Sequence, residues 1–295
     1  DGETFQLYLD YLKQSSPSLD GYKMVIDCAH GAACRVAGEL FSALGASVKL
    51  VHEDPDGSRI NVKCGATDTA DLQREVVAEG AAIGLALDGD ADRLIAVDEK
   101  GELVDGDAIM SICAIDMKNR GQLKGNTLVT TVMSNGGLDI LAEKYGFQLL
   151  RTSVGDRFVL EKMLEGGYNL GGEQSGHIIF SEYATTGDGL LTALQLLQVL
   201  KNCDAPLSTL ASRLERLPQV LVNREVAKKE GWSENPRIKE TINQVEKDLG
   251  RFGRVLVRPS GTEALIRVML EAPLPEERLY SYAHLIADVI EEEQS

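Results

Sequence analysis

Between residues 23 and 172 the same order of strand-like and helix-like segments occurs twice, and no other feature of this chain limits its fold as strongly. The strand-like segments are short apolar runs, and the helix-like segments carry apolar residues at helical spacing. The first copy places strand, helix, strand, helix and strand at residues 23–27, 32–45, 46–51, 68–80 and 81–87. The second copy places them at residues 127–133, 136–146, 147–151, 156–167 and 168–172. This alternation predicts βαβ units and mainly parallel sheets.

Two polar segments occupy equivalent places in the two copies. Sequence anchors align residues 28–31 with 133–136, and residues 79–80 with 165–166. Counting on from the second anchor places DGDAD at residues 88–92 opposite EQSGH at residues 173–177. Open α/β sheets bind ligands at the carboxyl ends of their parallel strands, so we expect both segments to serve one cleft. The alternative is an old duplication without a shared site, since a fold alone does not imply a function.

The pattern changes after Pro218. A strand, a helix, two strands about a tight loop and a last helix follow, which is typical of an α+β unit. The predicted fold class is therefore α/β, with two repeated α/β domains and a smaller α+β C-terminal domain. We predict domain bounds at residues 1–103, 104–217 and 218–295.

Composition excludes several classes of protein. The net charge of −16 has no compensating basic run, which argues against a nucleic-acid partner. No apolar stretch approaches the roughly 18 residues of a membrane helix, so we expect no membrane partner. The five scattered cysteines are typical of free thiols in a reducing compartment, and we expect a cytoplasmic location. Whether the protein forms a homodimer stays open.

Three carboxylates lie close together in the segment LDGDADRL. Asp88, Asp90 and Asp92 alternate along a loop that we take as extended, so their oxygens point to one side and can converge on a hard cation such as Mg²⁺. A calcium EF-hand is the rival metal site, but Arg93 replaces the glycine required at its sixth position and strands flank the loop. An ordinary polar turn is the other alternative, although crowded carboxylates without a counter-charge repel one another.

A second loop has the groups that a phosphate needs. Between residues 257 and 268, guanidinium groups, hydroxyls and open backbone N–H groups surround one turn, contributed by Arg258, Ser260, Gly261, Thr262 and Arg267. Mg²⁺ held by three carboxylates is usually completed by water and substrate phosphate, so the two loops together predict phosphoryl chemistry. A simple β-hairpin turn is the alternative reading of this loop alone.

Further polar residues are candidates for the same cleft. Arg151 and Arg157 flank the end of a strand and the start of a helix, where they can add positive charge and Asp156 can cap the helix. Glu173 and Ser175 carry hydrogen-bonding groups suited to a sugar, and His177 can act as a general acid or base near neutral pH. Ordinary capping, surface arginines and a structural histidine are the alternatives.

The segments DGDADR, GEQSGH and RPSGTE, in this order, resemble the α-D-phosphohexomutase family over essentially the whole chain. The resemblance implies an isomerase that binds a phosphosugar and Mg²⁺ and transfers a phosphoryl group through a sugar bisphosphate. It implies that Asp88, Asp90 and Asp92 hold Mg²⁺ and that Arg93 faces the reacting phosphate. Glu173 and Ser175 would contact sugar hydroxyls, and the loop of residues 258–262 with Arg267 would anchor the other phosphate. Gln174 favours an amino sugar, with glucosamine 1,6-bisphosphate as primer and intermediate.

The chain departs from the family at one motif. The family transfers phosphate from a phosphoserine in a loop of the type TASHNP, in a first α/β domain, and this sequence contains no Ser-His-Asn. We therefore expect a chain that lacks this N-terminal domain, binds Mg²⁺ weakly and does not turn over substrate alone. A mutase of glucose or mannose phosphates and a non-catalytic sugar-phosphate-binding protein stay open as alternatives.

Overall fold

The chain forms two compact units in the computed structural model, which describes residues 2–14, 16–260 and 263–295. The first unit runs to Ser134 and includes Leu141–Leu214, and the second combines Asn135–Ile140 with Glu215–Ser295. The short segment belongs to the second unit because Asn135 exchanges two hydrogen bonds with Leu217. Its Nδ2 donates to the Leu217 carbonyl at 3.1 Å, and its Oδ1 accepts from the Leu217 N–H at 2.9 Å.

The first repeat builds a five-stranded sheet in the order β2-β1-β3-β4-β5. Its strands are β1 (Lys23–Asp27), β2 (Ser47–Val51), β3 (Ile83–Leu87), β4 (Leu94–Asp98) and β5 (Leu103–Val104). β1 pairs in parallel with β2 and β3, whereas β4 and β5 are antiparallel to their neighbours. Every residue of β3 and β4 is buried, which explains why both strands lack charged residues before Asp98 at the end of β4.

The second repeat builds a sheet with the equivalent order, β7-β6-β8-β9. Its strands are β6 (Thr127–Thr131), β7 (Gln148–Thr152), β8 (Leu170–Gly172) and β9 (Ile178–Phe180). β6 pairs in parallel with β7 and β8, and β9 is antiparallel to β8, as β4 is to β3. The predicted repeat and the predicted α/β fold class are therefore confirmed.

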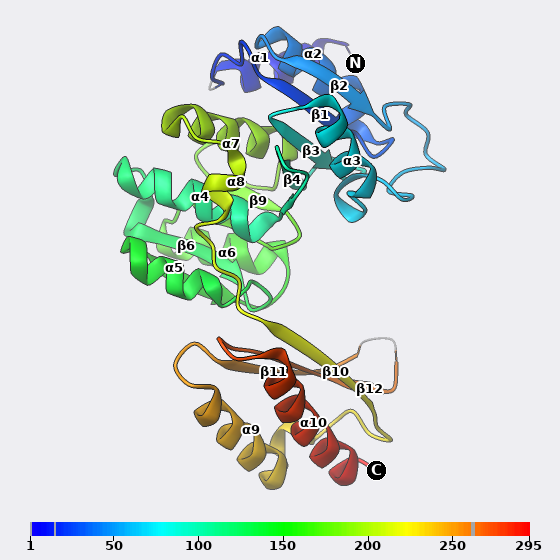
Figure 1. Cartoon of the computed structure of the whole chain (residues 1–295), viewed down its shortest axis with the longest axis vertical. Helices are drawn as coiled ribbons and strands as arrows, with labels where there is room; N and C mark the ends of the chain where they lie inside the picture. The colour runs from blue at the N-terminus through cyan, green and yellow to red at the C-terminus, as the bar shows by residue number, and fades with distance from the viewer. Residues whose placement is uncertain (1, 15, 261–262) are drawn as a thin grey trace. The chain divides into compact units, whose positions relative to one another are not determined.

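Two helices lie between the sheets of the first unit (Figure 1). α4 (Gly106–Asn119) and α7 (Gly189–Cys203) contact each other and strands of both repeats. The sequence pattern predicts no helix over residues 106–119. Nearly all of α4 is buried, so it lacks the polar face by which helices are usually recognised.

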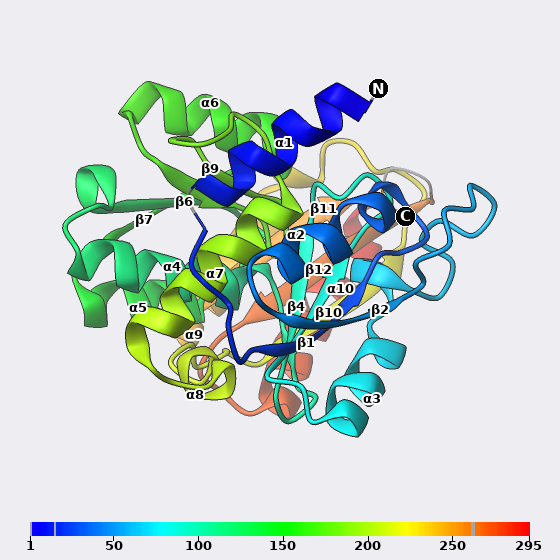
Figure 2. The same ribbon diagram turned by 90° about the horizontal axis from the view of Figure 1, so that it is seen from above.

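The remaining helices of the chain before Pro218 are α1 (Gly2–Gln14), α2 (Ala37–Ala43), α3 (Ala70–Glu79), α5 (Gly137–Tyr145), α6 (Asp156–Gly166) and α8 (Leu207–Ala211). Short 3-10 turns occupy Ala32–Arg35, Gly65–Thr67 and Lys124–Asn126. The helix predicted over residues 32–45 is therefore divided into a turn and α2, with Val36 between them. α1 lies beside the start of α7 (Figure 2), where Tyr8 donates a 2.8 Å hydrogen bond to Asp188.

The second unit is the predicted α+β unit. An antiparallel sheet has the order β10-β12-β11, made from β10 (Gln219–Glu225), β12 (Leu265–Glu271) and β11 (Arg254–Pro259). Its helices are α9 (Pro236–Leu249) and α10 (Glu276–Glu293), after a 3-10 turn at Trp232–Glu234. Both helices cover one face of the sheet (Figure 1) and share a core with it.

Among the residues that the structure describes, no helix is long and apolar enough to cross a membrane.

Candidate functional site

The three aspartates of the loop between β3 and β4 converge. Oxygen atoms of Asp88, Asp90 and Asp92 all lie within 4.8 Å of one another. The loop is a turn in which Ala91 has a φ of 62°, so the expectation of an extended, alternating loop was wrong. The left-handed residue folds the loop back, and this turn brings the three side chains together.

Burial gives this loop unusual electrostatics. Asp88 is only 6% exposed, and its Oδ1 accepts a 3.1 Å hydrogen bond from the Arg93 backbone N–H. Burial raises the pKa of Asp88 to about 6; the nearby carboxylates of Asp92 and Asp90 act in the same direction, and the hydrogen bond from Arg93 opposes them. A cation bound between the carboxylates would offset both the cost of burying the Asp88 charge and the repulsion among the three carboxylates.

The residues present fit a hard divalent cation. The loop offers carboxylate oxygens, which are the donors that Mg²⁺ prefers. Asp92 Oδ1 is buried and finds no hydrogen-bond partner within the described part of the chain, although Arg93 Nε lies 3.7 Å away. A buried carboxylate oxygen without a hydrogen bond is costly, and coordination to a metal ion would satisfy it.

The two repeats meet at their equivalent loops. Arg93 and His177 form an antiparallel β-bridge, and the Leu94 N–H donates to the Gly176 carbonyl at 3.0 Å. A further bond runs from the Gly189 N–H to the Ala91 carbonyl at 2.8 Å. The candidate metal-binding loop (residues 88–93) and the candidate sugar-binding loop (residues 173–177, called the sugar loop below) therefore adjoin, as their positions in the repeats predicted.

His177 connects the two loops through its ring. Nε2 accepts a 3.0 Å hydrogen bond from the Gly187 N–H, so the proton of the neutral ring lies on Nδ1. Nδ1 lies 3.0 Å from Asp92 Oδ2 and can donate to it. Because the ring is only 4% exposed and both nitrogens are engaged, these contacts favour a role in orienting Asp92. The catalytic role expected for His177 stays a prediction.

The sugar loop is a tight turn held by its own backbone. The Glu173 N–H donates to the His177 carbonyl and the Gly176 N–H donates to the Glu173 carbonyl, each at 3.0 Å. Glu173 Oε1 accepts from the Gly155 N–H at 3.0 Å, whereas Ser175 is exposed. Gly176 has a φ of 93°, and a Cβ there would lie 2.2 Å from the Leu94 carbonyl oxygen. Only glycine allows this close approach.

A pocket of about 460 Å³ lies where the two loops meet. It is lined by Ala66, Thr67, Arg93, Ile95, Asp105, Gln174 and Ser175. Arg93 Nε has no hydrogen-bond partner among the described residues, so it can donate to an incoming anion. The pocket therefore combines a cation, hydroxyl groups, an amide and a carboxylate, which suits a charged and hydroxylated small molecule.

The two arginines predicted near this cleft are not among the residues lining that pocket. Arg151 Nη1 donates to the Thr131 and Ser134 carbonyls at 3.1 and 2.7 Å, which ties down the connection after β6. Arg157 pairs with Glu161 at 2.8 Å, and its side chain is 80% exposed. Gly155 occupies the N-cap position of α6 without a side-chain capping bond, and Asp156 Oδ1 accepts a 2.8 Å hydrogen bond from the Arg157 N–H in the first turn.

In the second unit, the predicted phosphate loop joins β11 to β12. Arg258 and Arg267 are paired directly opposite each other across the two strands. Like charges at such positions repel, and a bound anion would relieve the repulsion. Arg267 Nε is buried without a hydrogen-bond partner in the described residues, while Ser260 is 5% exposed. The predicted Gly261 and Thr262 lie outside the described residues.

Lys229 is a cation at this loop that the sequence pattern does not predict. Its Nζ donates to the Ser260 carbonyl at 2.8 Å and to the Glu263 carbonyl at 3.1 Å. The contact spans more than thirty residues of sequence, and no local pattern marks Lys229 as a neighbour of the loop. The ammonium group adds positive charge beside the two arginines.

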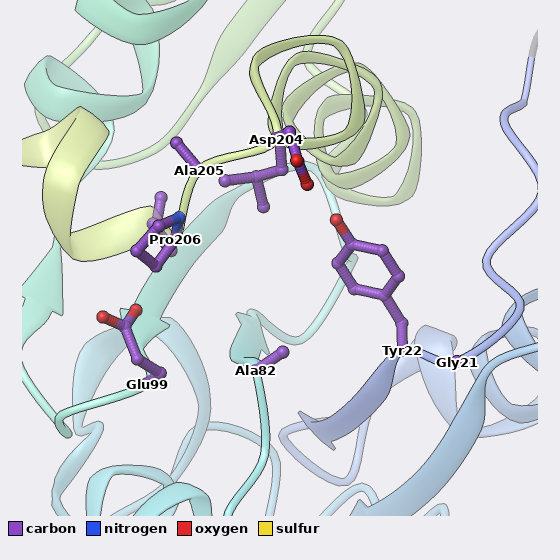
Figure 3. A pocket seen from close by; sticks show the side chains of 9 residues that line it. Gly21, Tyr22, Ala82, Glu99, Asp204, Ala205 and Pro206 are labelled. Atoms are coloured by element: carbon purple, nitrogen blue, oxygen red, sulfur yellow. The ribbon is translucent and has the colours of Figure 1, made fainter.

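A second pocket in the first unit lies away from these loops (Figure 3). It has a volume of about 350 Å³ and includes Tyr22, Glu99 and Asp204 in its lining. The Tyr22 hydroxyl points toward Asp204, and burial followed by this carboxylate raises the pKa of Tyr22. Glu99 accepts a 3.2 Å hydrogen bond from the Ser208 N–H.

One more group of metal-donor side chains occurs among the described residues. Asp27, His52 and Cys64 have donor atoms within 4.8 Å of one another. Both oxygens of Asp27 already accept 2.9 Å hydrogen bonds, from the Ala29 and Gly65 N–H groups. These hydrogen bonds explain why a carboxylate is buried here, because it holds the surrounding loops in place.

Comparison with protein families gives matches along most of the chain. Residues 6–101 match the phosphoglucomutase/phosphomannomutase alpha/beta/alpha domain II, residues 105–217 match alpha/beta/alpha domain III, and residues 221–289 match the C-terminal domain. A protein of Symbiobacterium thermophilum named phosphoglucosamine mutase is 56% identical over 269 residues. That alignment covers 91% of this chain and 60% of the relative, so the chain spans less than two thirds of its length.

Solved structures share the fold at low sequence identity. A phosphoglucomutase/phosphomannomutase family protein of Burkholderia thailandensis has a TM-score of 0.81 at 23% identity, covering 99% of this chain and 65% of that one. The Aspergillus fumigatus N-acetylphosphoglucosamine mutase in complex with GlcNAc-6P and magnesium has a TM-score of 0.78 at 21% identity, covering 99% and 66%. The family matches confirm what the three loop motifs predicted, and this chain belongs to the phosphoglucomutase/phosphomannomutase family, the α-D-phosphohexomutases.

Proposed function

We propose that this chain is the metal-holding and sugar-holding part of a phosphoglucosamine mutase, an isomerase that interconverts glucosamine 6-phosphate and glucosamine 1-phosphate. One observation carries the proposal. The metal-binding loop and the sugar loop, which come from two different repeats, adjoin at a pocket that includes Arg93 and Ser175. The names of curated relatives at 51–56% identity support the amino-sugar substrate.

Each group of residues has a distinct role in the proposed reaction. Asp88, Asp90 and Asp92 would hold Mg²⁺, which would supply positive charge to the phosphoryl group in transit. Arg93 binds that same phosphoryl group, and Ser175 and Glu173 bind sugar hydroxyls. His177 keeps Asp92 in place through the 3.0 Å contact of Nδ1.

The second unit would bind the phosphate that does not react. Arg258, Arg267 and the loop of residues 260–262 supply guanidinium and N–H donors, and Lys229 adds a neighbouring charge. Arg151 and Arg157 add positive charge near the cleft in this proposal. The bounds 1–103, 104–217 and 218–295 separate the metal-holding, sugar-holding and phosphate-holding domains.

The phosphoryl donor of the proposed cycle lies in another polypeptide segment. A phosphoserine gives its phosphoryl group to the sugar 6-phosphate, which becomes glucosamine 1,6-bisphosphate. The bisphosphate reorients in the site and returns its other phosphoryl group to the serine. No Ser-His-Asn motif occurs in this sequence, so we expect no turnover by this chain alone.

Turnover of glucosamine 6-phosphate tests the proposal. The chain is assayed with Mg²⁺ and the 1,6-bisphosphate primer, in parallel with a sample that also contains a separately produced phosphoserine domain. Activity only in the supplemented sample supports the proposal. Activity of the chain alone would show a phosphoryl acceptor within it, and absence of activity in both samples, with a full-length enzyme active, would favour a non-catalytic sugar-phosphate-binding role.

A mutase of glucose or mannose phosphates is the second candidate, because the family as a whole includes phosphoglucomutases and phosphomannomutases. A substrate panel on the full-length enzyme separates the two. The five cysteines are free, which fits the cytoplasmic location proposed for such an enzyme.

A further inference from the structure

A polar pair lines the pocket beside the sugar loop. Gln174 Nε2 donates a 3.2 Å hydrogen bond to Asp105 Oδ2, and both residues line the same pocket as Arg93 and Ser175. A carboxylate has only acceptors, so the amide nitrogen of Gln174 faces Asp105. This fixes the orientation of the amide and leaves its Oε1 as a second acceptor.

The carboxylate is held in place by the start of α4. Asp105 caps this helix, and its Oδ1 accepts from the Ala108 N–H at 3.2 Å. Asp105 is only 8% exposed. The start of α4 therefore fixes the position of the Asp105 carboxylate.

The sugar loop docks directly on this helix end. The Gly106 N–H donates to the Gln174 carbonyl at 3.0 Å. A Cβ at Gly106 would lie 2.2 Å from the Glu173 carbonyl oxygen, so only glycine allows the two backbones to approach this closely. Asp105 therefore has a fixed position relative to Glu173 and Ser175, which are the residues proposed to bind the sugar.

The pocket has the charge pattern of a zwitterionic ligand. Arg93 supplies a cation and Asp105 supplies an anion within one pocket of about 460 Å³. Glucosamine phosphate carries an anionic phosphate and a cationic ammonium group at C2. An ammonium group only donates hydrogen bonds, whereas the C2 hydroxyl of glucose is neutral and both donates and accepts.

We infer that Asp105, together with the Gln174 amide it orients, binds the C2 ammonium group of the substrate and so determines specificity for amino sugars. This inference rests on the proposed function, because it names the substrate class of that same pocket. Hydrogen bonds from a charged donor are stronger than those from a neutral one, so the site discriminates against an analogue whose donor at C2 is uncharged.

Full-length enzyme containing this chain provides the test. The values of kcat/KM are measured for glucosamine 6-phosphate and glucose 6-phosphate in the wild type and in Asp105→Asn. Asparagine has the same shape and is an equally good helix cap, but it carries no charge and presents an amide to Gln174. We expect the ratio of the two kcat/KM values to fall about tenfold, mainly through the amino sugar, as for a lost charge-assisted hydrogen bond.

Two further variants keep the test interpretable. Asp116→Asn is the matched control, since Asp116 lies in the last turn of the same helix and pairs with Arg120 at 2.6 Å. It should leave the ratio unchanged. Gln174→Leu removes the second acceptor without touching the helix cap, and it should lower the ratio in the same direction even if Asp105→Asn folds poorly.

The outcomes separate the inference from the function. Equal losses for both sugars in Asp105→Asn, or an unchanged ratio in Asp105→Asn and Gln174→Leu, would overturn the specificity role. A wild-type enzyme that turns over both sugars with equal kcat/KM would overturn it too, while leaving the mutase function intact. A wild-type enzyme that turns over neither sugar would instead refute the proposed function.

Discussion

Replacing His177 by Phe tests the proposed link between the two loops. Phenylalanine fills a similar volume but removes the Nδ1 proton that faces Asp92 at 3.0 Å and the Nε2 acceptor of the Gly187 N–H. The ring is 4% exposed, so water cannot readily replace either partner. Loss of a hydrogen bond that orients a metal ligand typically weakens metal binding by about 10- to 100-fold.

The assay is titration of the purified chain with Mn²⁺, followed by the electron paramagnetic resonance signal of the free ion. His284→Phe, on the exposed surface of α10, is the control and should not change the affinity. His177→Asn places an amide N–H near the original Nδ1 and should bind Mn²⁺ more tightly than His177→Phe. Thermal unfolding verifies that each variant is folded. A folded His177→Phe variant with wild-type affinity would refute the reasoning.

Three other predictions concern separate parts of the molecule. Gly176→Ala, which puts a Cβ 2.2 Å from the Leu94 carbonyl oxygen, should lower the free energy of unfolding by about 2 kcal/mol in urea titrations; an unchanged midpoint contradicts the geometry. Arg258→Met in the full-length enzyme should raise KM for the bisphosphate about tenfold or more with the melting temperature retained, and an unchanged KM would remove Arg258 from the phosphate site. Hydrogen bonds from Lys49 and then Lys23 lower the pKa of Glu79 from 4.5 to about 2, so its charged form stabilises the fold above pH 4.5. The difference in melting temperature between wild type and Glu79→Gln should thus be present at pH 7 and fade between pH 4.5 and 2; a constant difference would contradict it.

Periodicity and duplication predicted the arrangement of the strands well. Because DGDAD and EQSGH occupy equivalent places in the two copies, we predicted that they lie together, and Arg93 and His177 make that contact. The two repeats share one topology, and this topology fixes where the carboxyl ends of the parallel strands lie. Segments that follow those strands could therefore be placed from the sequence. The same patterns do not predict α4, because burial on all sides removes the polar face of this helix.

Features that depend on backbone turns or distant contacts were beyond the sequence. The aspartates converge because Ala91 adopts a left-handed conformation. Alanine rarely adopts this conformation, and no sequence motif predicts it here. Lys229 reaches the phosphate loop from another part of its unit, and Asp105 reaches the sugar loop through the docking of α4. Such neighbours depend on tertiary packing, so a local pattern carries no signal for them.

The seam between the two repeats includes backbone hydrogen bonds from Leu94 to Gly176 and from Gly189 to Ala91. Backbone groups are the same whatever side chain a residue carries. Side chains that face the ligand can therefore be exchanged without separating the loops, provided that the glycines remain. Such a scaffold is evolvable: new ligand preferences can arise by replacing a few residues that line the pocket, while the backbone joint between residues 88–93 and residues 173–177 is inherited unchanged.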